Sequence, residues 1–179
     1  MANFNEALEK TLQHEGGYVL TKVNDDLGGM TYAGISRRSN KSWEGWKLID
    51  DGSMCEERKE KLRALVNSLY RIMYWNPLKG DHISHQGMAN VVFDYAVNAG
   101  VKPAVTALQQ CLLYVGHKVA VDGIFGEKTL EALNYSETTA LCNAYTLARV
   151  SLYLNICKRD PSQHKFMVGW LTRALSYTV

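Results

Sequence analysis

A glutamate at the end of an apolar helix stripe is the residue best placed for chemistry. Leu8 and Leu12 lie seven and three positions before Glu15, so a helix beginning near Asn5 places all three on one face. A Gly-Gly pair follows at once, as is typical of a helix C-terminus, where unpaired carbonyl groups carry partial negative charge. Burial and this partial charge both favour the protonated carboxyl, which is the form that general-acid cleavage of a glycosidic bond requires. The alternative is a solvated glutamate at a helix end.

The segment 18–35 predicts a short β-hairpin or small sheet directly after this helix. Its apolar and β-branched residues flank an acidic cluster and a second Gly-Gly pair. Such a hairpin can set Asp26 and Thr31 across a cleft from Glu15, and two carboxyl groups in unlike environments are the usual arrangement for glycoside hydrolysis. Aspartate and Gly-Gly also form ordinary turns, which is the alternative.

Five further side chains are candidates for substrate binding. Tyr18, Trp43 and Trp46 are the aromatic ones, because aromatic faces stack on the apolar faces of sugar rings. The alternative for the tryptophans is that they cap the core. Asp94 and Asn98 lie four positions apart on one face of an apolar helix, so they could point at the site. Their alternative role is a buried hydrogen-bonded pair that ties helices together.

The elements that must position these residues are mostly helical. Apolar residues recur at helical spacing over several segments. We expect helices over residues 56–75, 88–99, 127–133, 136–158 and 166–177, with another that carries Pro103 in its first turn. The predicted fold class is therefore mainly α, a helical bundle with a small β-hairpin near the N-terminus. Regions 1–100 and 101–179 are expected to form one compact unit and to meet near Gly100.

Several sequence blocks, taken in order, resemble a known family. EGGY is followed by DxGGxT, GIS, YWNPLKGD, VFDYAVNAG, DGIFGEKT and FMVGWLTR. This series resembles glycoside hydrolase family 108, the N-acetylmuramidases with a lysozyme-like fold found among phage endolysins and secretion-activator proteins. The resemblance implies that Glu15 is the catalytic acid and that Asp26 and Thr31 are the Asp and Thr of the DxGGxT block.

The chain departs from the family pattern in one place. The family commonly has a short Asn-Asp-Pro segment after EGGY, whereas this chain has the longer VLTKVND. The departure leaves open whether Asp25 or Asp26 faces the sugar, and the motif favours Asp26. The second half resembles the peptidoglycan-binding segment that accompanies the catalytic region, although Asp122 and its neighbouring glycines could simply shape a turn.

Composition limits the class of protein. The 179 residues are the size of one domain, and a hydrophobic content of 46% suffices for a core. A net charge of +2 does not indicate nucleic-acid binding. The four cysteines and five histidines lack metal-ligand spacing, so no metal or other cofactor is expected. Cys111, Cys142 and Cys157 are expected to be free buried thiols.

The sequence also bears on location and partners. No window has the roughly 20 apolar residues needed to span a bilayer, and the first residues do not resemble a signal peptide. We therefore expect a protein made in the cytoplasm without a signal peptide and without stable membrane insertion. We expect it to be a monomer that acts on peptidoglycan glycan strands of the cell wall after release. The expected reaction is cleavage of the β-1,4 bond between N-acetylmuramic acid and N-acetylglucosamine. The alternatives are a lytic transglycosylase and an inactive wall-binding or secretion-related module.

Overall fold

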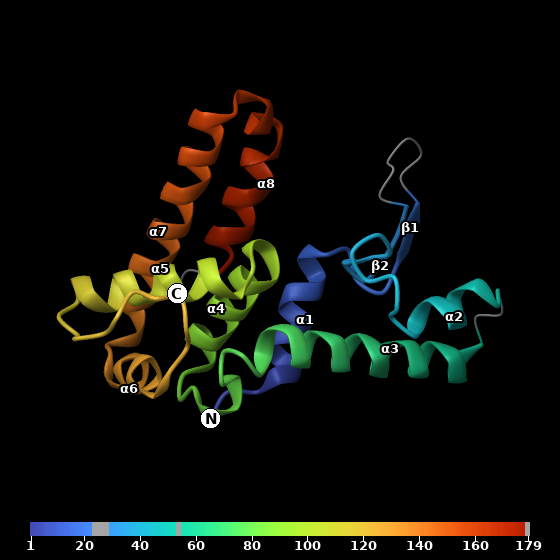
Figure 1. Cartoon of the computed structure of the whole chain (residues 1–179), viewed down its shortest axis with the longest axis horizontal. Coiled ribbons are helices and arrows are strands. Elements are labelled where there is room, and N and C mark those ends of the chain that lie inside the picture. Colours follow the sequence, from blue (N-terminus) through green and yellow to red (C-terminus); the bar gives the residue numbers. More distant parts are fainter. Residues whose placement is uncertain (23–28, 53–54, 178–179) are drawn as a thin grey trace.

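The computed structural model describes residues 1–22, 29–52 and 55–177, and this part of the chain is mainly helical. Figure 1 shows α1 and α4 in the middle of the molecule, with the sheet, α2 and α3 on one side and α5 to α8 on the other. The helices are α1 (Phe4–His14), α2 (Gly45–Asp50), α3 (Glu56–Tyr70), α4 (Gln86–Ala99), α5 (Val101–Tyr114), α6 (Glu127–Tyr135), α7 (Thr138–Arg159) and α8 (His164–Leu175). The strands are β1 (Leu20–Lys22), β2 (Met30–Tyr32) and β3 (Ile35–Ser36). The predicted mainly α class is confirmed.

Helix α1 begins and ends where its sequence signals indicate. The Asn3 side chain accepts hydrogen bonds from the N–H groups of Asn5 and Glu6, which satisfies donors that a helix N-terminus leaves free. Leu8 and Leu12 are buried, and the helix packs against α4. The apolar stripe of α1 therefore directs the residues at its C-terminal end toward the centre of the molecule.

The predicted hairpin is part of a three-stranded antiparallel sheet in the order β1-β2-β3. Tyr32 of β2 pairs with Leu20 on one side and with Ile35 on the other, so only two residues connect β2 and β3. These two, Ala33 and Gly34, have φ values of 48° and 75°. Positive φ at both positions is the signature of a type I′ turn, whose twist matches that of the strands.

The α3 region shows one difference from the predicted pattern. Apolar spacing predicts one face of the helix over residues 56–75 that carries Leu62, Leu65, Val66, Leu69, Ile72 and Met73. Leu62 and Val66 are fully buried, but Ile72 and Met73 are 63% and 45% exposed. The cause is a π-helical turn over Arg71–Trp75, which adds a residue to the turn and shifts the buried face. The short helix α2 was not predicted, because six residues are too few to show helical periodicity.

The two regions of the chain share one hydrophobic core. It runs from α1 and the sheet through α4 to α5, α6 and the first half of α7, while α7 and α8 lie side by side as an antiparallel pair (Figure 1). Cys111, Cys142 and Cys157 are buried free thiols, as predicted. Among the described residues, no helix combines the length and the apolar character that crossing a bilayer requires.

Candidate active site

Glu15 occupies the C-cap of α1. Its own N–H donates to the carbonyl oxygens of Thr11 and Leu12, which closes the last turn of the helix. The carboxyl side chain is 22% exposed, so it is mostly buried and still open to solvent at one edge. This placement meets the first requirement of a proton donor, because a group that reacts with substrate must be reachable.

The β2–β3 turn lies directly against this carboxyl. A Cβ added to Gly34 would lie 2.9 Å from Glu15 Oε2 and 2.6 Å from the hydroxyl of Tyr70. Glycine is therefore required at position 34 twice over, by its positive φ and by the lack of space for a side chain. The Tyr70 hydroxyl donates to the Ala33 carbonyl at 2.9 Å and so holds the turn in place. Burial, with the charge of Glu15, raises the pKa of Tyr70, so this hydroxyl keeps its proton.

A cation from the far end of the chain reaches the other carboxyl oxygen. Arg173 of α8 donates from Nη1 to Glu15 Oε1 at 2.8 Å, across 158 positions of sequence. Its Nε also donates to Asp94 of α4 at 2.9 Å. Burial opposes the charge of this guanidinium, but Asp94 and then Glu15 raise its pKa above the ordinary value. The sequence predicts burial and a helix end at Glu15, but it does not predict a cation there.

Behind Arg173 lies a fully buried pair of opposite charges. Asp94 and Arg149 both have side chains that are 0% exposed, and Arg149 Nη2 donates to Asp94 Oδ2 at 2.6 Å. Arg149 Nε then donates to the Tyr153 hydroxyl, which donates to Asn98 Oδ1 at 2.8 Å. The predicted substrate-binding residues Asp94 and Asn98 thus tie α4 to α7 and α8. Their position favours the alternative role stated for them, a buried hydrogen-bonded tie between helices.

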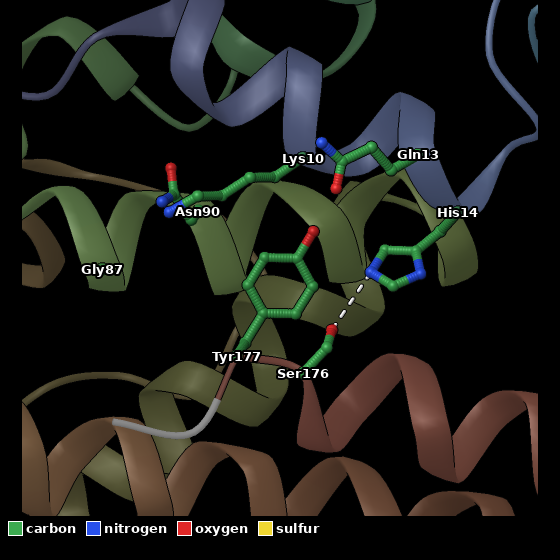
Figure 2. A pocket seen from close by; sticks show the side chains of 7 residues that line it. All are labelled: Lys10, Gln13, His14, Gly87, Asn90, Ser176 and Tyr177. Carbon is green, nitrogen blue, oxygen red and sulfur yellow. Dashed lines mark hydrogen bonds between the residues drawn. The ribbon is translucent and has the colours of Figure 1, made fainter.

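Figure 2 shows that Ser176 and Tyr177, which follow α8, lie against α1. Ser176 lies 3.1 Å from a ring nitrogen of His14, and Tyr177 lies over a hollow of about 430 Å³ that Lys10 and Asn90 also line. Burial lowers the pKa of His14, despite the opposing charge of Asp94, so its ring is kept closer to neutral. The C-terminal end of α8 is thus attached to the end of α1 by a second contact.

Of the other predicted catalytic residues, the structure describes Thr31. Thr31 lies half-buried in the middle of β2, three positions before Gly34, and its carbonyl oxygen accepts from the Thr21 hydroxyl at 3.4 Å. Asp26, and the alternative Asp25, lie outside the described residues.

The three aromatic candidates differ in exposure. Tyr18 is 37% exposed and lines a groove of about 490 Å³ between α1 and α3, where the Arg63 guanidinium lies 5.5 Å from the centre of its ring. Trp43 is half-buried and its ring stacks on Tyr32 with centroids 6.1 Å apart. Trp46 is only 3% exposed and donates from Nε1 to the Asn40 carbonyl. The position of Trp46 favours the alternative that it caps the core, whereas Tyr18 is accessible to a ligand.

The second half contains its own buried polar group. Gln109 is 1% exposed, and its amide oxygen accepts from the N–H groups of Asp122 and Gly123. Its amide nitrogen lies within hydrogen-bonding distance of Asp122 Oδ1 and Thr129 Oγ1. These contacts tie the turn before α6 to Gln109 of α5 and Thr129 of α6, which supports the alternative that Asp122 and its glycines shape a corner.

Comparison with known proteins agrees with this arrangement. Residues 8–100 match the family model described as Glycosyl hydrolase 108, which is more than half of the chain. The chain belongs to glycosyl hydrolase family 108. Residues 103–175 match a second model, described as Predicted Peptidoglycan domain. The chain is also similar to the solved structure of Brucella abortus SagA, with 26% identity and a TM-score of 0.69 over 97% of this chain and 90% of that one. A search of the curated proteins finds no match.

This family-108 protein has three residues at the site that sequence reasoning did not select. Gly34 belongs to the GIS block and Arg173 ends the FMVGWLTR block, so both lay within quoted motifs. Tyr70 lay within the helix predicted over residues 56–75, where no role was predicted for it. The signal for Arg173 was a basic residue in an otherwise apolar final helix, which local spacing could not connect to Glu15.

Proposed function

We propose that this family-108 protein is an N-acetylmuramidase that hydrolyses the β-1,4 bond between N-acetylmuramic acid and N-acetylglucosamine. Glu15 is the general acid that protonates the leaving oxygen. The observation that carries this proposal is the placement of Glu15, a mostly buried and solvent-reachable carboxyl at a junction of α1, the β2–β3 turn and α8.

The hydrogen bonds around the carboxyl suggest which oxygen carries the transferred proton. Among the described residues, the hydrogen bond to the carboxyl comes from Arg173 and binds Oε1. Oε2 faces the β2–β3 turn and lies next to Gly34, where a Cβ would come within 2.9 Å of it. We assign proton donation to Oε2, because an oxygen that accepts from a guanidinium is poorly placed to hold a proton.

The second carboxylate and the hydroxyl are assigned on the family motif. Asp26 stabilises positive charge at the sugar or positions a water, and Thr31 assists it. Tyr18 is the aromatic residue that we expect to contact the glycan, since it is the most exposed of the three aromatic candidates. The match of residues 103–175 to a peptidoglycan domain supports peptidoglycan as the polymer that is bound. We propose that the protein acts on the cell wall after release from the cytoplasm.

The test is digestion of purified peptidoglycan, followed by mass spectrometry of the soluble fragments. We expect new reducing muramic acid ends with wild type, and a loss of at least about 100-fold in rate with Glu15→Gln, which keeps the shape but cannot donate a proton. Glu60→Gln is the matched control, because it makes the same change at an exposed position of α3. Anhydro-muramic acid products would instead identify a lytic transglycosylase. An absence of cleavage by wild type would indicate a binding module.

A further inference from the structure

The contact between α8 and Glu15 joins the two family matches of this chain. Glu15 lies within residues 8–100, which match the glycosyl hydrolase model, and Arg173 lies within residues 103–175, which match the peptidoglycan domain. The Arg173 side chain is 11% exposed, and its guanidinium lies between two carboxylates. Its Nη1 contacts Glu15, and its Nε and Nη2 contact Asp94. One planar group therefore links the proposed acid to the buried centre of the other region.

Arg173 is held rigidly in this position. Asp94 receives Arg173 on one side and Arg149 on the other, and both Asp94 and Arg149 are fully buried. A guanidinium that makes a forked contact to one carboxylate has few other orientations open to it. The side chain of Arg173 thus cannot leave Glu15 without also breaking its contact with Asp94.

The charges around Glu15 determine what this contact does. Tyr70 and Tyr74 of the α3 region lie near the carboxyl, and burial, with the charge of Glu15, raises the pKa of both, so they remain neutral. On α1, His14 is kept closer to neutral by burial. Asp94 of α4 is already engaged by two arginines. Arg173 is therefore the charged group in direct contact with Glu15 among the described residues.

We propose that Arg173 is a positioning residue for Glu15, which fixes the carboxyl through Oε1 in the orientation from which Oε2 donates its proton. The proposal rests on the proposed role of Glu15 as the acid. It makes the C-terminal region part of the catalytic machinery, in addition to any role in binding peptidoglycan. The hydrolase region alone holds the acid but lacks the residue that orients it.

The effect of removing Arg173 follows from the loss of this anchor. Without the hydrogen bond to Oε1 the carboxyl can adopt other orientations, so the maximum rate of lysis falls. The substrate concentration at half the maximum rate should change little, because the proposal gives Arg173 no contact with the glycan. A purely structural role would lower stability without lowering the maximum rate per folded molecule.

The experiment measures the rate of peptidoglycan lysis against substrate concentration, at constant pH and ionic strength, for the full chain and three variants. For Arg173→Gln we expect a maximum rate about tenfold lower, with little change in the half-saturating concentration. For Arg173→Lys we expect an intermediate maximum rate, because one ammonium group keeps the charge but cannot contact both carboxylates in the same forked geometry. Lys165→Gln is the control, since it removes one positive charge from an exposed position of the same helix, and we expect no change.

A second measurement separates this proposal from the proposed function. The NMR signal of the Glu15 carboxyl carbon is compared at one pH in wild type and Arg173→Gln, with Glu15→Gln used to assign the signal. We expect a different chemical shift and a broader line in Arg173→Gln, because the carboxyl loses its fixed hydrogen bond, whether or not wild type cleaves peptidoglycan. The same signal in both proteins would overturn the proposal. If Arg173→Gln does not fold, Arg173→Lys is the deciding variant, and a wild-type maximum rate in that variant would overturn the proposal as well.

Discussion

Two buried polar groups of this molecule differ in how far they reach along the chain. The charged cluster, defined as Glu15, Asp94, Arg149 and Arg173, joins α1, α4, α7 and α8, and its longest contact spans 158 positions. The glutamine cluster, defined as Gln109, Asp122 and Thr129, spans at most 20 positions and lies around one turn.

The difference shows how polar groups for shape and polar groups for chemistry can be told apart. The glutamine cluster satisfies backbone groups of the turn, and each of its hydrogen bonds serves the local conformation. The charged cluster keeps Asp94 and Arg149 fully buried and Arg173 only 11% exposed, which is costly unless each charge is paired. It also ends on a carboxyl that is 22% exposed. A costly buried network that ends at the surface indicates a functional site.

The largest expected effect is on the charged cluster. Asp94→Asn leaves two buried guanidinium groups without their shared countercharge, so we expect the free energy of unfolding to fall by about 3–5 kcal/mol. Urea denaturation measures this. Asp50→Asn is the control, because Asp50 pairs with Arg37 at the surface, and we expect little change there. Equal losses in the two variants would show that the charged cluster is not a buried, coupled unit.

The glutamine cluster should affect stability alone. Gln109→Leu leaves the Gly123 N–H without its acceptor, so we expect unfolding to become easier by about 2 kcal/mol. The rate of peptidoglycan lysis per folded molecule should stay within about twofold of wild type. A large loss of rate in a variant that remains folded would remove the distinction between the two clusters.

A third prediction concerns the turn that contacts the charged cluster. Gly34→Ala places a methyl group within 2.9 Å of Glu15 Oε2, so the carboxyl must move, and we expect a rate about tenfold lower. Gly52→Ala is a matched control, because Gly52 has a similar positive φ of 79° and open space around it. Both variants carry the backbone strain, so only their difference in lytic rate reports on Glu15. Equal rates would mean that the contact with Gly34 does not position the acid.

The smallest expected effect is a pH dependence of the glutamine cluster. The N–H of Ile124 and then the amide of Gln109 lower the pKa of Asp122. A carboxyl with a lowered pKa in the folded state adds stability above its ordinary pKa, and this stability is lost as pH falls through the folded value. The difference in Tm between wild type and Asp122→Asn should therefore be larger at pH 7 than near pH 3. The measurement is thermal unfolding of both proteins at the two pH values. Equal Tm differences at pH 7 and near pH 3 would contradict the prediction.

The contrast between local and distant contacts also explains what the sequence could predict. The long helices could be predicted because apolar periodicity is a local signal, and the position of Glu15 at the end of its helix could be predicted because the helix stripe and the following glycines are neighbours. The contact of Glu15 with Arg173 could not be predicted, since no local pattern relates the first helix to the last. Trp46 looked like a sugar platform, but its burial depends on packing between α2 and α3 that spacing does not reveal. The exposure of Ile72 and Met73 follows from a π-helical turn that a regular helical period does not anticipate.

The 158 positions between Glu15 and Arg173 also have a consequence for folding kinetics. Helices form in microseconds from neighbouring residues, whereas a contact between the two ends of a chain must wait until the intervening segments have been brought together. During refolding, we therefore expect the helical signal to recover before lytic activity does. A chain stopped in between would hold most of its helices, but Glu15 and Arg173 would still be apart.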